Sequence, residues 1–222
     1  MVAESPSRQG HPRHITVGTI LLGRRYANAM IVTHPKLTFE EYLNYDDGTD
    51  TYYELVDGEL VEVPLASRRH WKISKRLERL FEEQIAELNC NWDVGRGDVG
   101  VKTRGGKSDN NRIPDVVVFN SETDSILDES NILTDAPILV VEIVSPGKAN
   151  RERDYIEKRR EYEQIGIPEY WIVDPDRQQI VLLSLEGKTY REEVYTGDRP
   201  LVSSTFPGLT LTCDRVLGSL KI

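Results

Sequence analysis

Residues 138–144 read ILVVEIV, an apolar run that contains one carboxylate, Glu142. Pro137 precedes the run and Ser145-Pro146 follows it, so this short, β-branched run predicts a buried strand. An ionised glutamate in a buried strand costs several kcal/mol unless something compensates its charge. A buried Lys or Arg partner, an edge position that faces water and a bound metal ion are the three candidates.

The composition predicts one folded domain. The chain has 222 residues, of which 38% are hydrophobic and 29% charged, as in ordinary soluble proteins. Cys90 and Cys213 form no Cys-x-x-Cys pattern, so we expect no disulfide framework, no zinc site and a reducing, cytoplasmic location. No run approaches 18 apolar residues, so no membrane-spanning helix is predicted. The net charge of −9 argues against nucleic-acid binding over the whole surface, so any such contact must be local.

The N-terminal region looks like a secretory signal but departs from one. Its apolar segment, 15–22, is short, and Arg24 and Arg25 separate it from the small residues that would form a cleavage site. We interpret residues 1–33 as a flexible extension with few contacts to the core, and residues 34–222 as the domain. Both Met1 and Met30 remain candidate starts.

Local signals divide the domain into strands and helices. Thr38 followed by Glu41 predicts a capped helix, and Asp57-Gly58 predicts a hairpin turn. Residues 67–88 carry apolar side chains at helical spacing and predict the longest helix. The remaining predicted elements are a strand at 94–103, a polar loop at 104–111, strands at 112–119 and 138–144, a helix at 150–165, a strand at 169–174 and a hairpin at 179–195. This order predicts an α/β (α+β) fold, a mixed β-sheet flanked by helices.

Two carboxylates fit a metal site. Asp115 opens one predicted strand and Glu142 lies in the next one, so adjacent strands could bring them together as ligands of Mg²⁺. Asp154, Lys158 and Tyr162 share a helix face, and a lysine beside metal-bound carboxylates suits hydrolysis of a phosphodiester. The alternatives are a turn cap for Asp115 and a surface ion pair between Asp154 and Lys158.

Five motifs carry a resemblance to a known family. YELVDGEL (53–60), RIPDVVVF (112–119), VVEIVSP (140–146), DYIEKRREY (154–162) and GIPEYWIVDP (166–175) occur in this order. Together they resemble the bacterial Uma-type family of restriction endonuclease-like proteins, a domain of unknown function in the PD-(D/E)XK nuclease superfamily. The resemblance covers about residues 35–211 and implies a restriction-endonuclease-like core, dependence on Mg²⁺ or Mn²⁺, and hydrolysis of DNA.

The resemblance also implies roles for four residues. Asp115 and Glu142 would be metal ligands, Glu54 an additional active-site acid and Lys158 the catalytic lysine. The chain departs from the superfamily pattern at Val144, where a lysine usually stands two residues after the glutamate. We therefore expect Lys158 to reach the carboxylates from the following helix, and a site that binds metal without cutting if it does not. Glu54 could also be an exposed hairpin residue.

Candidate DNA contacts and an oligomeric state complete the predictions. The basic residues that we expect to contact phosphates are Arg68, Arg69, Lys72, Arg76, Lys148 and Arg151, although a solvated helix face is the alternative. His70 is interpreted as a capping or surface residue. A homodimer is expected by analogy with nucleases that cut both strands. Competing functions are a nuclease-like protein that binds DNA without cleaving it, in a regulatory role, and a hydrolase of a smaller phosphoester.

Overall fold

The computed structural model describes residues 16–17, 30–31, 36–106, 108–124 and 130–218. The helical segments are α1 (Phe39–Leu43), α2 (Arg68–Leu88), α3 (Ser121–Asp124), α4 (Lys148–Glu152), the π-helix η1 (Arg153–Lys158), α5 (Arg159–Ile165) and α6 (Cys213–Leu217). The strands are β1 (Thr16–Val17), β2 (Met30–Ile31), β3 (Tyr53–Val56), β4 (Glu59–Glu62), β5 (Trp92–Gly95), β6 (Gly100–Arg104), β7 (Asp109–Arg112), β8 (Val116–Asn120), β9 (Ile132–Leu133), β10 (Leu139–Ile143), β11 (Glu169–Asp174), β12 (Gln179–Glu186) and β13 (Thr189–Thr196). The short strands β1 and β2 pair with each other, and the rest of the predicted extension 1–33 lies outside the described residues.

A mixed six-stranded sheet forms the centre of the fold. Its strand order is β13-β12-β11-β10-β8-β5, and β10 and β11 are its one parallel pair. A second, five-stranded sheet has the order β4-β3-β7-β6-β9. The predicted α+β class with a mixed sheet is therefore confirmed, although the residues divide into two sheets rather than one.

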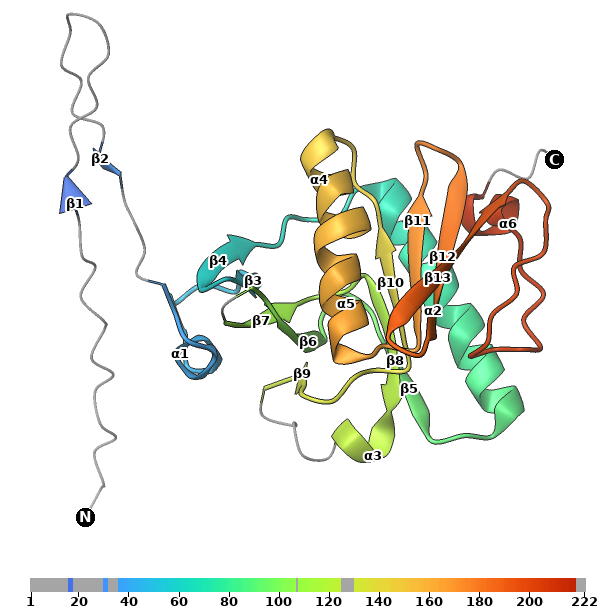
Figure 1. The fold of residues 1–222 in the computed structure, drawn as a ribbon, viewed down its shortest axis with the longest axis horizontal. Helices are drawn as coiled ribbons and strands as arrows, with labels where there is room; N and C mark the ends of the chain where they lie inside the picture. The colour runs from blue at the N-terminus through green and yellow to red at the C-terminus, as the bar shows by residue number, and fades with distance from the viewer. Residues whose placement is uncertain (1–15, 18–29, 32–35, 107, 125–129, 219–222) are drawn as a thin grey trace, which may run out of the picture.

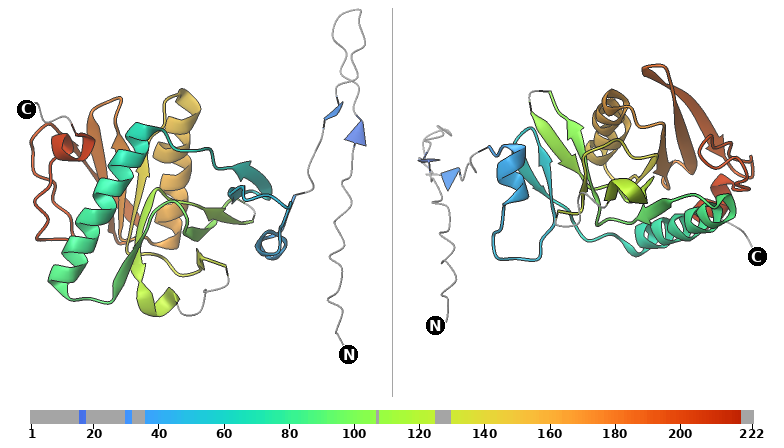
Figure 2. Two further views of the ribbon diagram at one scale, coloured as in Figure 1. Left: turned by 180° about the vertical axis from the view of Figure 1, so that it is seen from behind. Right: turned by 90° about the horizontal axis from the view of Figure 1, so that it is seen from below.

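Helices cover both faces of the six-stranded sheet. Figure 1 shows the α4–η1–α5 segment in front of the strands with α2 behind them, and the reverse view in Figure 2 brings α2 to the front. Among the described residues, no helix is long and apolar enough to cross a membrane.

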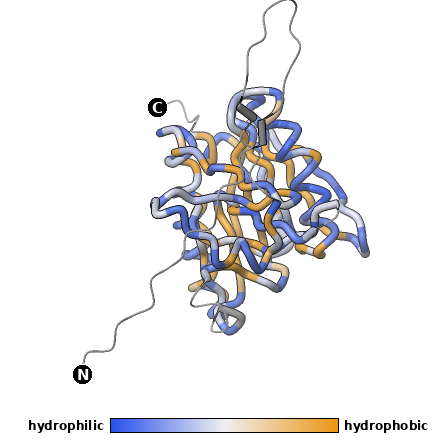
Figure 3. Tube along the Cα trace, turned by 90° about the vertical axis from the view of Figure 1, so that its left-hand side faces the viewer, coloured by the Kyte–Doolittle hydropathy of each residue, from blue (hydrophilic) through white to orange (hydrophobic). Residues whose placement is uncertain are grey.

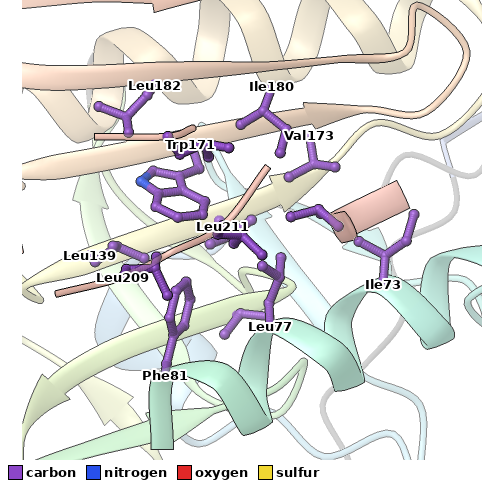
Figure 4. Packing of buried hydrophobic residues seen from close by; sticks show 14 of the residues in the cluster. Ile73, Leu77, Phe81, Leu139, Trp171, Val173, Ile180, Leu182, Leu209 and Leu211 are labelled. Carbon is purple, nitrogen blue, oxygen red and sulfur yellow. The ribbon is translucent and has the colours of Figure 1, made fainter. Parts of the chain in front are cut away.

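Each face of the sheet has its own core. On one face Ile73, Leu77 and Phe81 of α2 pack against Leu139 and Trp171, as Figure 4 shows. On the other face Val117, Val140 and Ile172 pack with Tyr162 of α5 and with Val101 of β6. Apolar segments accordingly gather along the central strands in Figure 3, while polar segments dominate the periphery. Burial on both faces explains why β10 and β11 read as nearly continuous apolar runs.

Several local predictions are confirmed. The side chains of Thr38 and Glu41 each accept a hydrogen bond from the other residue's backbone N–H, which is the expected capping box at α1. Asp57 and Gly58 both have positive φ, 48° and 84°, as the tight turn between β3 and β4 requires. Gly166 ends α5 in the left-handed region with φ of 83°.

Two predictions about residues 94–112 are wrong. The single strand predicted over 94–103 is two strands, β5 and β6, which belong to different sheets because the chain turns at 96–99. The polar loop predicted over 104–111 contains β7, which pairs with β6 and β3. Its side chains Asn110, Asn111 and Arg112 are polar yet buried, so no apolar alternation marks the strand.

The helix predicted over 150–165 also differs in detail. It starts earlier, at Lys148, and its middle turn, η1, is a π-helix. A π-turn holds one residue more than an α-turn, so the side chains before and after it change their relative direction. Asp154 and Lys158, both in this turn, are buried.

Candidate active site

Asp115 and Glu142 lie opposite each other on neighbouring strands. In the β8–β10 ladder Val116 pairs with Val141 and Val117 with Val140, so the next position places Asp115 opposite Glu142. Side chains alternate between faces, so both carboxylates share the face of Val117 and Val140, which is covered by α5. Asp115 Oδ2 also accepts a hydrogen bond of 2.6 Å from the backbone N–H of Ile143. The two predicted strands are adjacent, and Asp115 and Glu142 lie at neighbouring positions at one end of this pair of strands.

Lys158 is the partner that compensates Glu142. Its Nζ lies 2.8 Å from Oε1 of Glu142, and the hydroxyl of Tyr162 donates to the same oxygen at 2.7 Å. Glu142 is only 3% exposed. Lys158 therefore reaches the carboxylate from the helix after the strand, while Val144 is buried in the apolar core.

Glu54 joins the same cluster from the five-stranded sheet. Its Oε1 lies 3.0 Å from Nζ of Lys158 and accepts a hydrogen bond of 3.1 Å from the backbone N–H of Ile113. Its Oε2 lies 3.2 Å from Nη1 of Arg112. Glu54 is therefore a buried member of the cluster and not an exposed hairpin residue.

Arg112 and Glu161 were not identified from the sequence. Arg112 donates to both oxygens of Glu161 in a bidentate pair, with Nη2–Oε1 of 2.5 Å and Nε–Oε2 of 2.8 Å. Thr103 of β6 also donates to Glu161 at 2.7 Å. The arginine thus connects Glu54 on β3 to α5 and fixes the five-stranded sheet against the helix. The only sequence signal was its position as the first residue of RIPDVVVF.

His70 also belongs to the cluster. Ser67, not His70, caps α2, and its side chain accepts a hydrogen bond from the backbone N–H of His70. The imidazole extends to Asp115, with 2.6 Å between Nε2 and Oδ1. The sequence interpretation of His70 as a capping or surface residue is therefore wrong.

Asp154 is the most deeply buried carboxylate of the helix. Its side chain is 0% exposed, and Oδ1 accepts a hydrogen bond of 2.9 Å from Nε of Arg153. Oδ2 is buried and has no hydrogen-bond partner among the residues that the structure describes. The surface ion pair that the sequence allowed for Asp154 and Lys158 is excluded, because both residues are buried.

The two glutamates that share Lys158 have opposite pKa shifts. Burial and the neighbouring carboxylates Asp115, Asp154 and Glu54 raise the pKa of Glu142 to about 8 against the attraction of Lys158. Burial would also raise the pKa of Glu54, but Lys158 and Arg112 outweigh it and lower the pKa to about 2. Burial would lower the pKa of Lys158 and of His70, but Glu142, Glu54 and Asp154 raise that of Lys158, and the hydrogen bond with Asp115 raises that of His70. Glu54 thus has two cations in contact, Lys158 and Arg112, whereas the cation in contact with Glu142 is Lys158.

The candidate DNA-contacting residues fall into two groups. Arg69 donates to the carbonyl of Pro175 at 2.7 Å, Arg76 to the carbonyl of Val216, and Arg151 forms an ion pair with the buried Asp174 at 3.0 Å. These three contacts hold parts of the fold together. The other three candidates, Arg68, Lys72 and Lys148, are exposed.

The fold is that of a class of nuclease-like proteins, as comparison with a solved structure shows. The structure matches that of an Anabaena variabilis protein described as "a putative nuclease belonging to DUF820", with a TM-score of 0.66 and 19% sequence identity over 82% of this chain and 98% of that chain. The family described as "Uma2: Putative restriction endonuclease" matches residues 39–214, and the chain belongs to this family.

A curated relative is similar over part of its length. The uncharacterized protein slr1290 of Synechocystis sp. is 30% identical over 119 residues, which are 54% of this chain and 59% of that protein. The family expected from the five motifs is thereby confirmed.

Proposed function

We propose that the protein is a Mg²⁺-dependent endonuclease that hydrolyses phosphodiester bonds of DNA. The observation that supports this most is the position of Lys158, whose ammonium contacts Glu142 and Glu54 beside Asp115. This is the set of groups that the family resemblance assigns to the active site, and it is assembled from four separate segments of the chain.

The residues of the cluster fit a divalent cation. Their donor atoms are carboxylate oxygens, which Mg²⁺ prefers as ligands. In the part of the chain that the structure describes, no group of three His, Cys, Asp or Glu residues is arranged to hold an ion directly. Asp115 and Glu142 would therefore be the two protein ligands, with waters, backbone carbonyls or phosphate oxygens as the others.

The residues have separable roles in this proposal. A bound Mg²⁺ supplies activation of the attacking water and polarisation of the phosphate. Asp115 and Glu142 would hold the ion, and Lys158 would stabilise the negative charge that grows on the phosphate in the transition state. Glu54 and Tyr162 fix Lys158 and Glu142 in position, because each contacts one of them within the buried cluster.

The test is cleavage of supercoiled and single-stranded DNA with Mg²⁺ or Mn²⁺, combined with calorimetric metal titration. Asp115→Ala and Glu142→Ala should lose both metal binding and cleavage. Lys158→Ala should keep the metal affinity or raise it slightly, because a like charge is removed, and slow cleavage by about two orders of magnitude or more. Asp93→Ala, at an exposed position of β5, and Lys188→Ala, in the exposed turn before β13, are the matched controls.

Lys158→Ala leaves two buried carboxylates without their cation, so its thermal melt must show a folded protein before its rate is interpreted. Intact metal affinity in the Asp115 and Glu142 variants would contradict the assigned roles. Cleavage by Lys158→Ala at the rate of the unmodified protein would contradict them too.

A second candidate is a nuclease-like protein that binds DNA without cleaving it. Its support is that both oxygens of Asp115 already have donors, His70 and the backbone N–H of Ile143, and that Lys158 is held by two carboxylates. Binding of DNA without cleavage under either metal would favour this candidate.

A further inference from the structure

We propose that Asp154 is a third acidic residue of the metal site and that its Oδ2 accepts a hydrogen bond from a water molecule of the hydrated divalent cation. The inference rests on the proposed metal dependence, which the family resemblance assigns to Asp115 and Glu142 but not to any residue of the π-turn. The geometry of Asp154 carries it.

The buried oxygen needs a partner. Oδ2 is inaccessible and finds no hydrogen-bond partner in the described part of the chain, whereas Oδ1 accepts a hydrogen bond of 2.9 Å from Nε of Arg153. Leaving a buried acceptor unsatisfied costs about 1–3 kcal/mol, and more when the group is charged. Native proteins satisfy nearly all such atoms, so an unsatisfied one in an active-site cluster indicates an absent ligand or water.

Asp154 lies in a π-turn together with the proposed catalytic lysine. Asp154 and Lys158 belong to the same turn, η1, and both are buried although charged. The hydroxyl of Tyr170 donates to the carbonyl of Asp154 at 2.8 Å, which fixes this backbone position against β11. Single π-turns in long helices are frequent at functional sites, and here the turn presents one acidic and one basic side chain.

Asp154 belongs to the same group of buried charges as the proposed ligands. Its carboxylate interacts electrostatically with Lys158 and Arg153 and with the carboxylates of Asp115 and Glu142. A cation between these carboxylates would relieve their mutual repulsion.

The contact must pass through water. No three acidic or histidine side chains among the described residues are arranged as direct ligands, so Asp154 does not complete an inner coordination sphere. Mg²⁺ keeps several of its waters in protein sites, and a buried carboxylate oxygen can accept a hydrogen bond from one of them. Residues that act on a metal in this indirect way change its affinity by about 10- to 100-fold when they are replaced.

The competing explanation is purely structural. In that case Asp154 is the buried counter-ion of Arg153 and Lys158, and its charge stabilises the fold without a metal. The two explanations predict opposite signs for the stability of the metal-free protein.

Asp154→Asn tests the inference in the full chain. The asparagine keeps the shape and the Oδ1 acceptor for Arg153, so the melting temperature in EDTA should be unchanged or higher. Calorimetric titration with Mn²⁺ should show an affinity lower by about 10- to 100-fold. Asp174→Asn is the matched control: Asp174 is also buried, but both of its oxygens have donors, from Arg151 and Tyr155 among others. This control should melt at a lower temperature and bind Mn²⁺ like the unmodified protein.

Three results would overturn the inference, and they have different meanings. Asp154→Asn that melts well below the unmodified protein, or does not fold, shows the structural role. Unchanged Mn²⁺ affinity in Asp154→Asn, with affinity lost in Asp115→Asn, removes Asp154 from the metal site but leaves the proposed function intact. Absence of Mn²⁺ binding by the unmodified protein contradicts the proposed metal dependence itself and the inference with it.

Discussion

The ionisation of Glu142 in its apolar strand depends on charged neighbours from several elements. Lys158 compensates it directly, yet Asp115 and Asp154 lie near enough to oppose its ionisation. Glu54 shares the same lysine but has Arg112 and a backbone N–H as additional partners. Two glutamates on one ammonium can therefore differ strongly in acidity, because the number of opposite charges around each decides its pKa.

Glu54 should make the stability of the protein depend on acid pH. Its pKa is about 2 in the folded state against an ordinary 4.5, so its ionised form stabilises the fold above pH 4.5, and this contribution is lost as the pH falls toward 2. Glu54→Gln should lower the free energy of unfolding at pH 7 by roughly 3 kcal/mol, and the difference from the unmodified protein should shrink between pH 4.5 and 2. Urea denaturation across this range measures it.

The matched control is Glu62→Gln, which changes an exposed glutamate at the end of β4. It should alter the unfolding free energy little at any of these pH values. A difference between Glu54→Gln and the unmodified protein that is constant with pH would contradict the assignment.

At the scale of elements, one buried carboxylate holds the C-terminal segment onto the six-stranded sheet. Glu169 at the start of β11 accepts hydrogen bonds from the backbone N–H groups of Ser204 and Thr205 at 2.8 and 3.0 Å. It also accepts from Ser203 Oγ at 2.7 Å and from the indole N–H of Trp171 at 2.6 Å. These contacts position Phe206, which stacks on Phe81 of α2.

Glu169→Gln should therefore loosen residues 201–211. Replacing one carboxylate oxygen by an N–H₂ group removes acceptors from several donors, and hydrogen bonds to charged groups are worth about 1.5–3 kcal/mol each. We expect a loss of stability of about 3 kcal/mol and faster hydrogen exchange at the amides of Ser204 and Thr205. Glu83→Gln, on the exposed face of α2, is the control. Unchanged exchange at both amides would contradict this role.

The elements that the sequence predicted are those with local or periodic signals. The stripe of α2, the apolar runs of β10 and β11, and the caps at Thr38 and Gly166 each act within a few residues. The polar strand β7 could not be predicted, because its side chains are satisfied by distant partners: Arg112 bonds to Glu161, 49 residues away. The π-turn was missed for a related reason, since one extra residue leaves the overall helical pattern almost unchanged.

The residues of the candidate site also fall into two groups, those that sequence motifs predicted and those that only the structure revealed. Asp115, Glu142, Glu54 and Lys158 lie in motifs that could be read from the sequence, and the structure brings them together. His70 and Arg112 join them through contacts across 45 and 58 residues of chain, for which no local pattern exists. Only the fold brings such pairs to one place.

At the scale of the whole molecule, the acidic net charge leaves few places for DNA. Arg68 and Lys72 are exposed and lie one turn apart at the start of α2, the same turn from which His70 contacts Asp115. They are exposed at the end of α2 that carries His70, whereas Arg76 holds the carbonyl of Val216.

Arg68→Ala combined with Lys72→Ala should weaken DNA binding for all sequences alike. Each lost phosphate contact should also reduce the slope of log affinity against log salt by about 0.9. Fluorescence anisotropy at several salt concentrations measures both effects. Lys188→Ala, on the far hairpin turn, should change neither, and an unchanged slope in the double variant would exclude this end of α2 as a DNA contact.

The last prediction concerns assembly. Each chain contributes one cluster around Lys158, and cleavage of a duplex needs two scissions on antiparallel strands, which a two-fold symmetric homodimer would supply. Light scattering should therefore give a mass twice the 25.4 kDa of one chain at micromolar concentration.

Mixed dimers test whether both sites of the pair are needed to cut a duplex. When the unmodified protein is mixed with excess Asp115→Ala and allowed to exchange subunits, the mixed dimers should nick supercoiled DNA to the open circle without linearising it. A species of 25.4 kDa alone, even with duplex DNA present, would contradict the homodimer. If the amount of linear DNA instead follows the fraction of unmodified chains in the mixture, each chain cuts independently of its partner.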